Sequence, residues 1–308
     1  MFMKFKNFTS INDLDKEGID FVFREADNML KLLENKKPSN ICRNKILATL
    51  FFEPSTRTRL SFECAMHRLG GSVIGFADAN TSSEKKGESL FDTIRTVESY
   101  CDVIAIRSPF EGASKLAMQN SSVPIINAGD GGHEHPTQTL LDLYTIKKNK
   151  NRLSNLKIGL CGDLKFGRTA HSLAQALSDY DNNILVCISP DELQFPEGIK
   201  NKLEEKGTKI LQTKNLKEAM GELDVLYMTR IQKERFVSEK EYLKLKGIYV
   251  VDKEMLSGAK QDFILMHPLP RVDEINPEVD EDKRSIYFKQ AFYGIPIRMA
   301  LLSIMTRG

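Results

Sequence analysis

The sequence lacks the features that mark several common classes of protein. Its 5 cysteines are scattered, without a C-x-x-C pair or a nearby histidine at zinc-ligand spacing. This spacing indicates free thiols in a reducing compartment rather than a disulfide framework or a metal centre. The cysteines stand at Cys42, Cys64, Cys101, Cys161 and Cys187.

Charge of one sign and long apolar runs are also missing. Lys plus Arg is 44 against 42 acidic residues, so the formal net charge is +2. This balance argues against a general nucleic-acid or membrane-surface partner. No run reaches the roughly 18 apolar residues of a membrane span, and residues 1–10 lack the apolar core of a signal peptide. We therefore expect a cytoplasmic, soluble protein.

Apolar runs of strand length alternate with amphipathic segments of helix length. The expected strands are residues 46–52, 72–76, 103–106, 123–127, 156–160, 183–188, 209–212, 225–228 and 263–266. The expected helices are residues 15–33, 55–69, 89–100, 113–119, 137–147, 168–177, 199–206, 216–220 and 285–305. Alternation of this kind predicts an α/β fold of two doubly wound lobes with mostly parallel sheets. The active site is expected in the interdomain cleft, where strand carboxyl ends face it.

A polar run over residues 147–152 carries no apolar side chain and marks the expected crossing between domains. Residues 1–147 then form the first domain and residues 148–284 the second. The C-terminal helix, residues 285–308, is expected to pack back on the first domain. Pro296 predicts a kink or a break in that helix.

Residues 51–63 join a buried strand to a helix through hydroxyl and guanidinium groups, which indicates an anion site. Ser55 is the expected N-cap, and the unpaired N–H groups of a helix start suit phosphate. Arg57 and Arg59 lie about 200° apart on a helix, so both cannot face one ligand. We assign Arg57 to the ligand, because Arg59 can pair with Glu63 one turn later. The alternative is an ordinary capped helix with solvated charges.

Four further polar residues each follow an expected strand: Arg107, His135, Asp163 and Arg230. His135 comes after a glycine-rich turn and just before a helix whose first turn contains Gln138. It is as readily a structural histidine as a catalytic one. The glycine-rich segment before Arg168 has neither dinucleotide-binding nor P-loop spacing, so Arg168 is either a surface charge or an anion ligand.

Two later loops can recognise carboxylates or fix carbonyl groups. The loop with Arg230, Gln232 and Arg235 is either a solvated segment or a bidentate grip for carboxylates. The loop of residues 267–271 contains two prolines, which fix the backbone carbonyls around them. A stiff turn and a functional loop are compatible interpretations there.

Together these motifs resemble a known family. Residues 51–59, FFEPSTRTR, resemble the carbamoyl-phosphate motif of the transcarbamoylases. The segments HPTQ at 135–138, GDLKFGR at 162–168, TRIQ at 229–232 and HPLPR at 267–271 follow in family order. The chain is thus similar, over nearly its whole length, to the aspartate carbamoyltransferase catalytic chains of the aspartate/ornithine carbamoyltransferase family.

The resemblance implies a function: transfer of the carbamoyl group of carbamoyl phosphate to the α-amine of L-aspartate, early in de novo pyrimidine biosynthesis. It implies no metal and no cofactor. The implied carbamoyl-phosphate ligands are Ser55, Thr56, Arg57, Thr58, Ser82, Lys86, Arg107, His135, Gln138 and the carbonyls of Pro268 and Leu269. The implied catalytic groups among them are Arg57, Thr58, Arg107, His135 and Lys86. The implied aspartate ligands are Lys86, Arg168, Arg230 and Gln232.

The resemblance also implies an assembly and a closing movement. Ser82 and Lys86 would enter the site of a neighbouring chain in a homotrimer, with Lys85 left as the alternative to Lys86. Glu53 would pair with Arg168 and Arg235 on domain closure. The Leu269–Pro270 bond would be cis. Regulatory chains or dihydroorotase are candidate further partners.

Two alternatives stay open. Ornithine carbamoyltransferase shares the first half, but its Ser-Met-Gly loop and His-Cys-Leu-Pro segment are missing from this sequence. A non-catalytic anion-binding relative would keep the fold without turnover. The arginines of the second half favour a dicarboxylate over a cationic amine.

Overall fold

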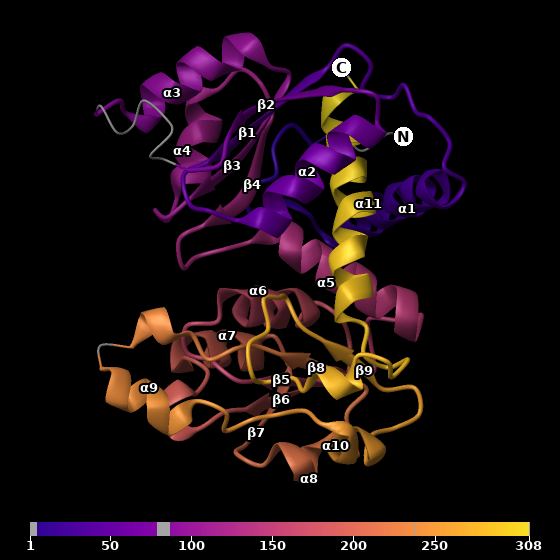
Figure 1. Cartoon of the computed structure of the whole chain (residues 1–308), viewed down its shortest axis with the longest axis vertical. Helices are drawn as coiled ribbons and strands as arrows, with labels where there is room; N and C mark the ends of the chain where they lie inside the picture. The colour runs from indigo at the N-terminus through magenta and orange to yellow at the C-terminus, as the bar shows by residue number, and fades with distance from the viewer. Residues whose placement is uncertain (1–4, 79–86, 237, 308) are drawn as a thin grey trace. The chain divides into compact units, whose positions relative to one another are not determined.

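The computed structural model describes residues 5–78, 87–236 and 238–307. The chain divides into two compact units, each described by itself (Figure 1). Unit 1 is Met1–Leu141 with Phe292–Gly308, and unit 2 is Asp142–Ala291. These bounds differ by a few residues from those expected, and the C-terminal residues 292–308 belong to unit 1. Which substrate each domain binds stays a prediction, as does a site in a cleft between them.

Unit 1 is built on a parallel sheet with the strand order β2-β1-β3-β4. The strands are β1 (Ile46–Phe51), β2 (Ser72–Phe76), β3 (Val103–Ser108) and β4 (Ile125–Asp130). Strands β1, β3 and β4 are almost wholly buried, which is consistent with the apolar runs of β1 and β3 and the apolar start of β4.

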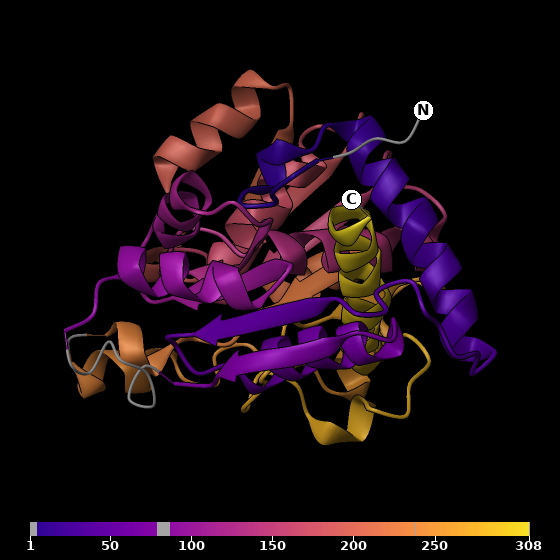
Figure 2. The same cartoon turned by 90° about the horizontal axis from the view of Figure 1, so that it is seen from above.

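Helices connect and cover the strands of unit 1. They are α1 (Lys16–Glu34), α2 (Thr56–Arg68), α3 (Leu90–Val97), α4 (Ala113–Asn120), the start of α5 (Pro136–Lys150) and the end of α11 (Tyr287–Thr306), with the short η1 (Ile11–Asp13) and η4 (Glu98–Tyr100). In both views α11 lies beside α1 (Figures 1 and 2). Arg307, the residue after α11, lies 3.3 Å from Glu25 of α1 in an ion pair.

Unit 2 has a parallel sheet with the order β7-β6-β5-β8-β9. Its strands are β5 (Lys157–Cys161), β6 (Ile184–Ile188), β7 (Lys209–Thr213), β8 (Val225–Met228) and β9 (Ile264–Met266). Its helices are α6 (Arg168–Leu177), α7 (Glu197–Glu205), α8 (Leu216–Met220), α9 (Glu239–Leu245) and α10 (Lys253–Ser257), with η5 (Asp191–Leu193), η6 (Lys233–Arg235) and η7 (Pro277–Val279). The prediction of two α/β lobes with parallel sheets is confirmed. In the described part of the chain, no helix is long and apolar enough to span a membrane.

Two helices are more continuous than the sequence pattern indicates. The helix before the polar run is longer than expected, because α5 continues to Lys150. The Lys150 ammonium is buried and donates to the carbonyl and the carboxylate of Asp262, at 2.7 and 2.6 Å. Helix α11 continues through Pro296 without a break. Burial of its residues from Ile297 to Met305 outweighs the roughly 3 kcal/mol cost of an internal proline.

A buried polar network fixes the loop that follows β9. His267 Nδ1 accepts the Leu269 N–H at 2.8 Å, and His267 Nε2 lies 2.7 Å from Glu274 Oε1. The ring proton therefore lies on Nε2 and is donated to Glu274. Glu274 Oε2 also accepts the N–H groups of Val272 and Asp273. The loop contains the Leu269–Pro270 cis peptide, as predicted.

Gly75 allows β2 to lie close to β1, and replacing it should therefore lower the stability of the protein. It has φ +147° in β2, and an added Cβ would lie 2.1 Å from the carbonyl oxygen of its neighbour Thr49. We expect Gly75→Ala to destabilise the protein by more than about 1 kcal/mol. The matched control is Gly198→Ala in α7, where a Cβ meets nothing within 4 Å and should stabilise by about 0.5–1 kcal/mol. Urea midpoints by circular dichroism measure both, and equal midpoints would contradict the prediction.

Glu274 generates a prediction about acid stability. Burial alone would raise its pKa, but the hydrogen bonds from His267 and the backbone hold the pKa below the ordinary 4.5. A folded-state pKa below the unfolded value stabilises the protein above pH 4.5, and this contribution is lost as the pH falls through the folded pKa. Glu274→Gln should therefore lower the unfolding free energy by about 1–3 kcal/mol at pH 7 and by less in acid. The exposed Glu281→Gln serves as control. A constant difference from pH 7 to pH 3 would refute this account.

Candidate functional site

In unit 1, the predicted polar groups follow the carboxyl ends of three neighbouring parallel strands. Residues 52–58 follow β1, Arg107 lies near the end of β3, and His135 comes after the turn that follows β4. Phe51 is the register partner of Arg107, and the Phe52 N–H donates to the Arg107 carbonyl at 2.8 Å. The carboxyl edge of a parallel sheet is where such folds bind ligands.

The start of α2 is open to a ligand. Ser55 occupies the N-cap, as expected, but its side chain makes no capping hydrogen bond. The first N–H groups of a helix have no partner within it and carry the positive end of its dipole. Thr56 and Arg57 are exposed, while Thr58 is buried. Arg59 lies 3.6 Å from Glu63, which agrees with its assignment away from the ligand.

Arg107 places a buried positive charge beside this helix start. Its side chain is 9% exposed, and one of its terminal nitrogens lies 2.9 Å from Glu53 Oε2. The other donates to the Ala128 carbonyl at 3.3 Å, while its buried Nε makes no hydrogen bond. Burial lowers the pKa of Arg107, the charge of Arg57 lowers it further, and the Glu53 carboxylate opposes both. Glu53 therefore compensates a charge that an anion could also neutralise.

His135, which follows β4, lies close to Thr58 in the first turn of α2. His135 Nε2 lies 3.4 Å from Thr58 Oγ1, and both residues are buried. The His135 carbonyl accepts the N–H groups of Gln138 and Thr139, so His135 stands at the start of α5. Gln138 is half-buried in the first turn of that helix. Thr58 and His135, which lie 77 residues apart in sequence, are thus brought together.

Unit 2 repeats the arrangement with another set of groups. Arg168 begins α6 after β5, Arg230 and Gln232 follow β8, and Pro268 and Leu269 follow β9. Strands β5, β8 and β9 are neighbours in the sheet. Arg168, Arg230 and Gln232 are half-buried. The carboxyl edge of this sheet therefore carries two guanidiniums, an amide and a fixed pair of carbonyls.

Asp163 supports two of these loops. Its Oδ1 accepts the Phe166 N–H at 3.0 Å, and its Oδ2 lies 3.5 Å from Gln232 Nε2. Burial raises the pKa of this carboxyl, against the effect of the hydrogen bonds it accepts. The sequence indicated Asp163 only as a residue that follows a strand. Its spacing of three residues before Phe166, typical of an N–H-accepting aspartate, is the signal that was missed.

Three expected site residues lie outside the described part of the chain: Ser82, Lys85 and Lys86. Arg235 is exposed in η6. Glu53 pairs with Arg107, a contact that the sequence did not predict, and its pairing with Arg168 and Arg235 stays a prediction. Among residues 5–78, 87–236 and 238–307, no cluster of three histidines, cysteines or carboxylates could hold a metal ion.

The arrangement suits anionic ligands. Unit 1 presents a helix start, hydroxyl groups and two guanidiniums, which is the chemistry of a phosphate site. Unit 2 presents two guanidiniums and an amide, which is the chemistry of carboxylate recognition.

Two family models match the chain. Residues 6–148 match the aspartate/ornithine carbamoyltransferase carbamoyl-P binding domain, and residues 154–305 match the Asp/Orn binding domain of the same family.

Individual relatives are similar over almost the whole chain. The aspartate carbamoyltransferase catalytic subunit of Thermococcus kodakarensis is 58% identical over 98% of this chain and 97% of its own. The Clostridium novyi subunit is 58% identical over 97% of both. The solved catalytic subunit of M. jannaschii aspartate transcarbamoylase has 52% identity and a TM-score of 0.93 over 98% of both chains.

A further solved relative is aspartate transcarbamoylase from Trypanosoma cruzi in complex with N-(phosphonacetyl)-L-aspartic acid. It has 41% identity and a TM-score of 0.92, over 97% of this chain and 95% of its own. Two family domains that together span most of the chain, and relatives well above half identical, leave no other assignment. The chain belongs to the aspartate/ornithine carbamoyltransferase family.

Proposed function

We propose that the protein transfers the carbamoyl group of carbamoyl phosphate to the α-amine of L-aspartate, giving N-carbamoyl-L-aspartate and phosphate. The observation that carries this proposal is that one chain contains both a phosphate-type site, in unit 1, and a carboxylate-type site, in unit 2. The T. cruzi relative, solved with carbamoyl phosphate and aspartate at 40% identity, supports it. The activity makes the protein an aspartate carbamoyltransferase.

The chemistry needs positioned charge rather than a covalent intermediate. The neutral amine nitrogen attacks the carbamoyl carbon, a C–N bond forms, and the C–O bond to the phosphate breaks. The amine proton leaves with the phosphate. Negative charge develops on the carbamoyl oxygen and then on the leaving group, so fixed cations and donors stabilise the transition state more than the ground state.

The groups of unit 1 are assigned to carbamoyl phosphate. The first turn of α2, with Ser55, Thr56, Arg57 and Thr58, holds the phosphate, and Arg107 reaches it as well. Arg107, Thr58 and His135 donate to the carbamoyl oxygen. The 3.4 Å contact of Thr58 with His135 supports their action at one atom. Gln138 binds the carbamoyl nitrogen.

The groups of unit 2 are assigned to aspartate and to the carbamoyl nitrogen. Arg168, Arg230 and Gln232 bind the two carboxylates of aspartate. The carbonyls of Pro268 and Leu269 accept from the carbamoyl nitrogen. The hydrogen bond of the Leu269 N–H to His267 Nδ1 supports this role for Pro268, because the N–H shares its peptide plane with the Pro268 carbonyl and fixes the orientation of that carbonyl. Positioning of this kind can supply about 7–11 kcal/mol of the barrier.

Ornithine is the less suitable acceptor. Its side chain carries a second ammonium group, which needs a carboxylate partner. Asp163 lies at a strand end of unit 2, but its carboxylate is buried and already accepts hydrogen bonds from Phe166 and Gln232. The guanidiniums of Arg168 and Arg230 would repel the ornithine ammonium.

The assembly is proposed to be a homotrimer with shared sites. Ser82 and Lys86, which precede α3 in the sequence, would complete the carbamoyl-phosphate and aspartate sites of a neighbouring chain, with Glu53 and Arg235 acting in closure. A cytoplasmic location and a place early in pyrimidine biosynthesis are further parts of the proposal.

Substrate choice and the role of α2 are tested together. Wild-type protein should form carbamoyl aspartate from carbamoyl phosphate and aspartate, and little product with ornithine. Arg57→Ala should lower kcat by about 100- to 1,000-fold, because it removes charge from the developing phosphate. Arg59→Ala is the matched control, since its guanidinium pairs with Glu63. No turnover with either amine would refute the proposed function, and equal losses in the two variants would refute the assignment of Arg57.

Shared sites are tested by mixing inactive chains. Arg57→Ala and Lys86→Ala chains should each be inactive alone. If each site draws Arg57 from one chain and Lys86 from another, mixed trimers contain some intact sites and regain part of the activity. Rates are measured after joint unfolding and refolding of the two variants, with each variant refolded alone as control. Mixed samples no faster than either parent would place the whole site in a single chain.

A further inference from the structure

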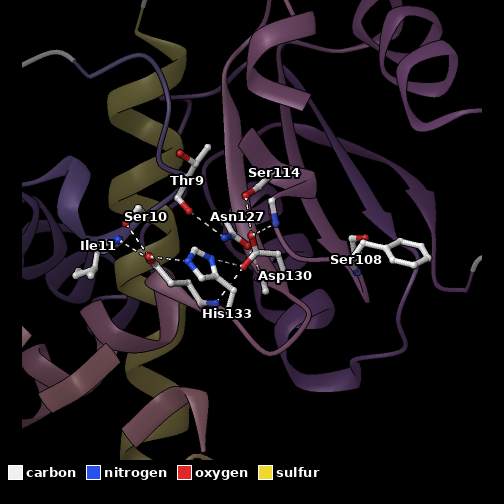
Figure 3. A network of polar contacts seen from close by, with 12 residues as sticks. Thr9, Ser10, Ile11, Ser108, Ser114, Asn127, Asp130 and His133 are labelled. Atoms are coloured by element: carbon white, nitrogen blue, oxygen red, sulfur yellow. Dashed lines mark hydrogen bonds and ion pairs between the residues drawn. The ribbon is translucent and has the colours of Figure 1, made fainter. Parts of the chain in front are cut away.

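The turn between β4 and His135 is fixed by two buried carboxylates (Figure 3). Asp130 Oδ1 accepts the Glu134 N–H at 3.1 Å, and Asp130 Oδ2 accepts from the Gly112 N–H and the Ser114 hydroxyl. The Asp130 N–H donates to the Glu134 carbonyl. Asp130 therefore closes the turn from within and joins it to the start of α4.

Glu134 reaches from this turn to a segment far away in the sequence. Its Oε1 accepts the Ser10 hydroxyl at 2.9 Å, and its Oε2 accepts the Ile11 N–H at 3.1 Å. Glu134 is 8% exposed, and it directly precedes His135 in the sequence. In Figure 3, Ser10 and Ile11 lie on one side of the turn and Asp130 with Ser114 on the other. The carboxylate thus links the turn to the N-terminal segment.

The N-terminal segment can serve as an anchor because it is itself fixed to β4. Phe8 is fully buried, donates its N–H to the Ile125 carbonyl and accepts the Asn127 N–H, both at 2.9 Å. The Asn127 side chain donates to the Thr9 carbonyl. Ser10 begins η1 with a reciprocal capping box that includes Asp13. Residues 8–13 therefore form a rigid edge along the strand that leads to His135.

From these contacts we propose that Glu134 is a positioning residue for His135. Its carboxylate holds the last residue before His135 against the Ser10–Ile11 backbone, so the imidazole keeps its place beside Thr58. This inference rests on the proposed function, in which His135 acts on the carbamoyl oxygen. Glu134 touches no substrate and contributes through the geometry of its neighbour.

The positioning of His135 depends on the hydrogen bonds of the Glu134 side chain rather than on its negative charge. A glutamine at position 134 offers one oxygen to the Ile11 N–H, and its amide can donate to Ser10, whose hydroxyl can rotate to accept. His133 is a weaker link, because it is 43% exposed and lies 3.6 Å from Asp130 and 3.9 Å from Glu134. The turn should therefore tolerate Glu134→Gln and His133→Asn, but not Glu134→Ala.

Four variants test the inference in the full-length protein. At saturating substrates we expect Glu134→Ala to lower kcat by about 10- to 100-fold with little change in either KM. Ser10→Ala removes one of the two bonds and should lower kcat by about threefold. Glu134→Gln and His133→Asn should stay within twofold of wild type. If Glu134→Ala does not fold, Ser10→Ala and Glu134→Gln still decide the matter.

A second measurement does not depend on turnover. The 13Cε1–1H signal of His135, one of 5 histidines, can be assigned with a His135→Asn variant. Glu134→Ala and Ser10→Ala should shift this signal in the absence of substrate, and Glu134→Gln should not. If wild type has no activity but the shifts follow this order, the proposed function fails while the positioning role stands.

Two results would overturn the inference. One is wild-type kcat together with an unmoved His135 signal in both Glu134→Ala and Ser10→Ala. The other is a loss in Glu134→Gln as large as in Glu134→Ala, which would assign the effect to charge instead of to the hydrogen bonds.

Discussion

The burial of the Arg107 guanidinium beside Glu53 is the constraint on which the first half of the site depends. A buried charge is costly unless it is paired and hydrogen-bonded, and Arg107 has a carboxylate at 2.9 Å and a carbonyl at 3.3 Å. Arg57 and the open start of α2 add positive charge nearby, and the pKa of Arg107 is lowered by burial and by Arg57. The positive charge of this region is therefore only partly compensated by Glu53. A phosphate would complete the set of charges, which supports the proposed binding of carbamoyl phosphate here.

The two units place their candidate site residues in the same way. Each places its functional groups after three adjacent parallel strands, where side chains from distant parts of the sequence meet at one edge of the sheet. The groups differ in kind: hydroxyls and a histidine accompany the arginines of unit 1, while an amide and fixed carbonyls accompany those of unit 2. Since both sets are cationic, the neutral groups around the arginines would distinguish the proposed phosphate ligand of unit 1 from the proposed dicarboxylate of unit 2.

Much of this could be predicted from the sequence, because strand length, helix periodicity and the position of polar residues after strands are local signals. The helices α6 and α8 and the strand β8 have the predicted bounds, and the pairing of Arg59 with Glu63 follows from helix geometry. Long-range pairing is not encoded in this way. The residues around Lys150 give no sign that its ammonium will pair with Asp262 at the end of a longer α5. The residues around Glu53 likewise give no sign of its ion pair with Arg107. The roles of Asp130 and Glu134 were missed for the same reason, since their partners lie in residues 10–11 and 112–114.

Buried carboxylates fix three of the loops that carry predicted site residues, and the groups they bond to explain why an anion-binding protein tolerates them. Glu134 holds the turn before His135, Glu274 holds the loop that contains Pro268 and Leu269, and Asp163 holds the segment before Arg168. Each accepts hydrogen bonds from backbone N–H groups, which partly compensate its negative charge. It therefore repels an incoming anion less than a carboxylate without such partners would. A hydrogen bond to a main-chain N–H also fixes the path of the loop independently of the neighbouring side chains. In the proposed function these residues make no substrate contact, and they act by fixing the loops whose groups are assigned to the substrates.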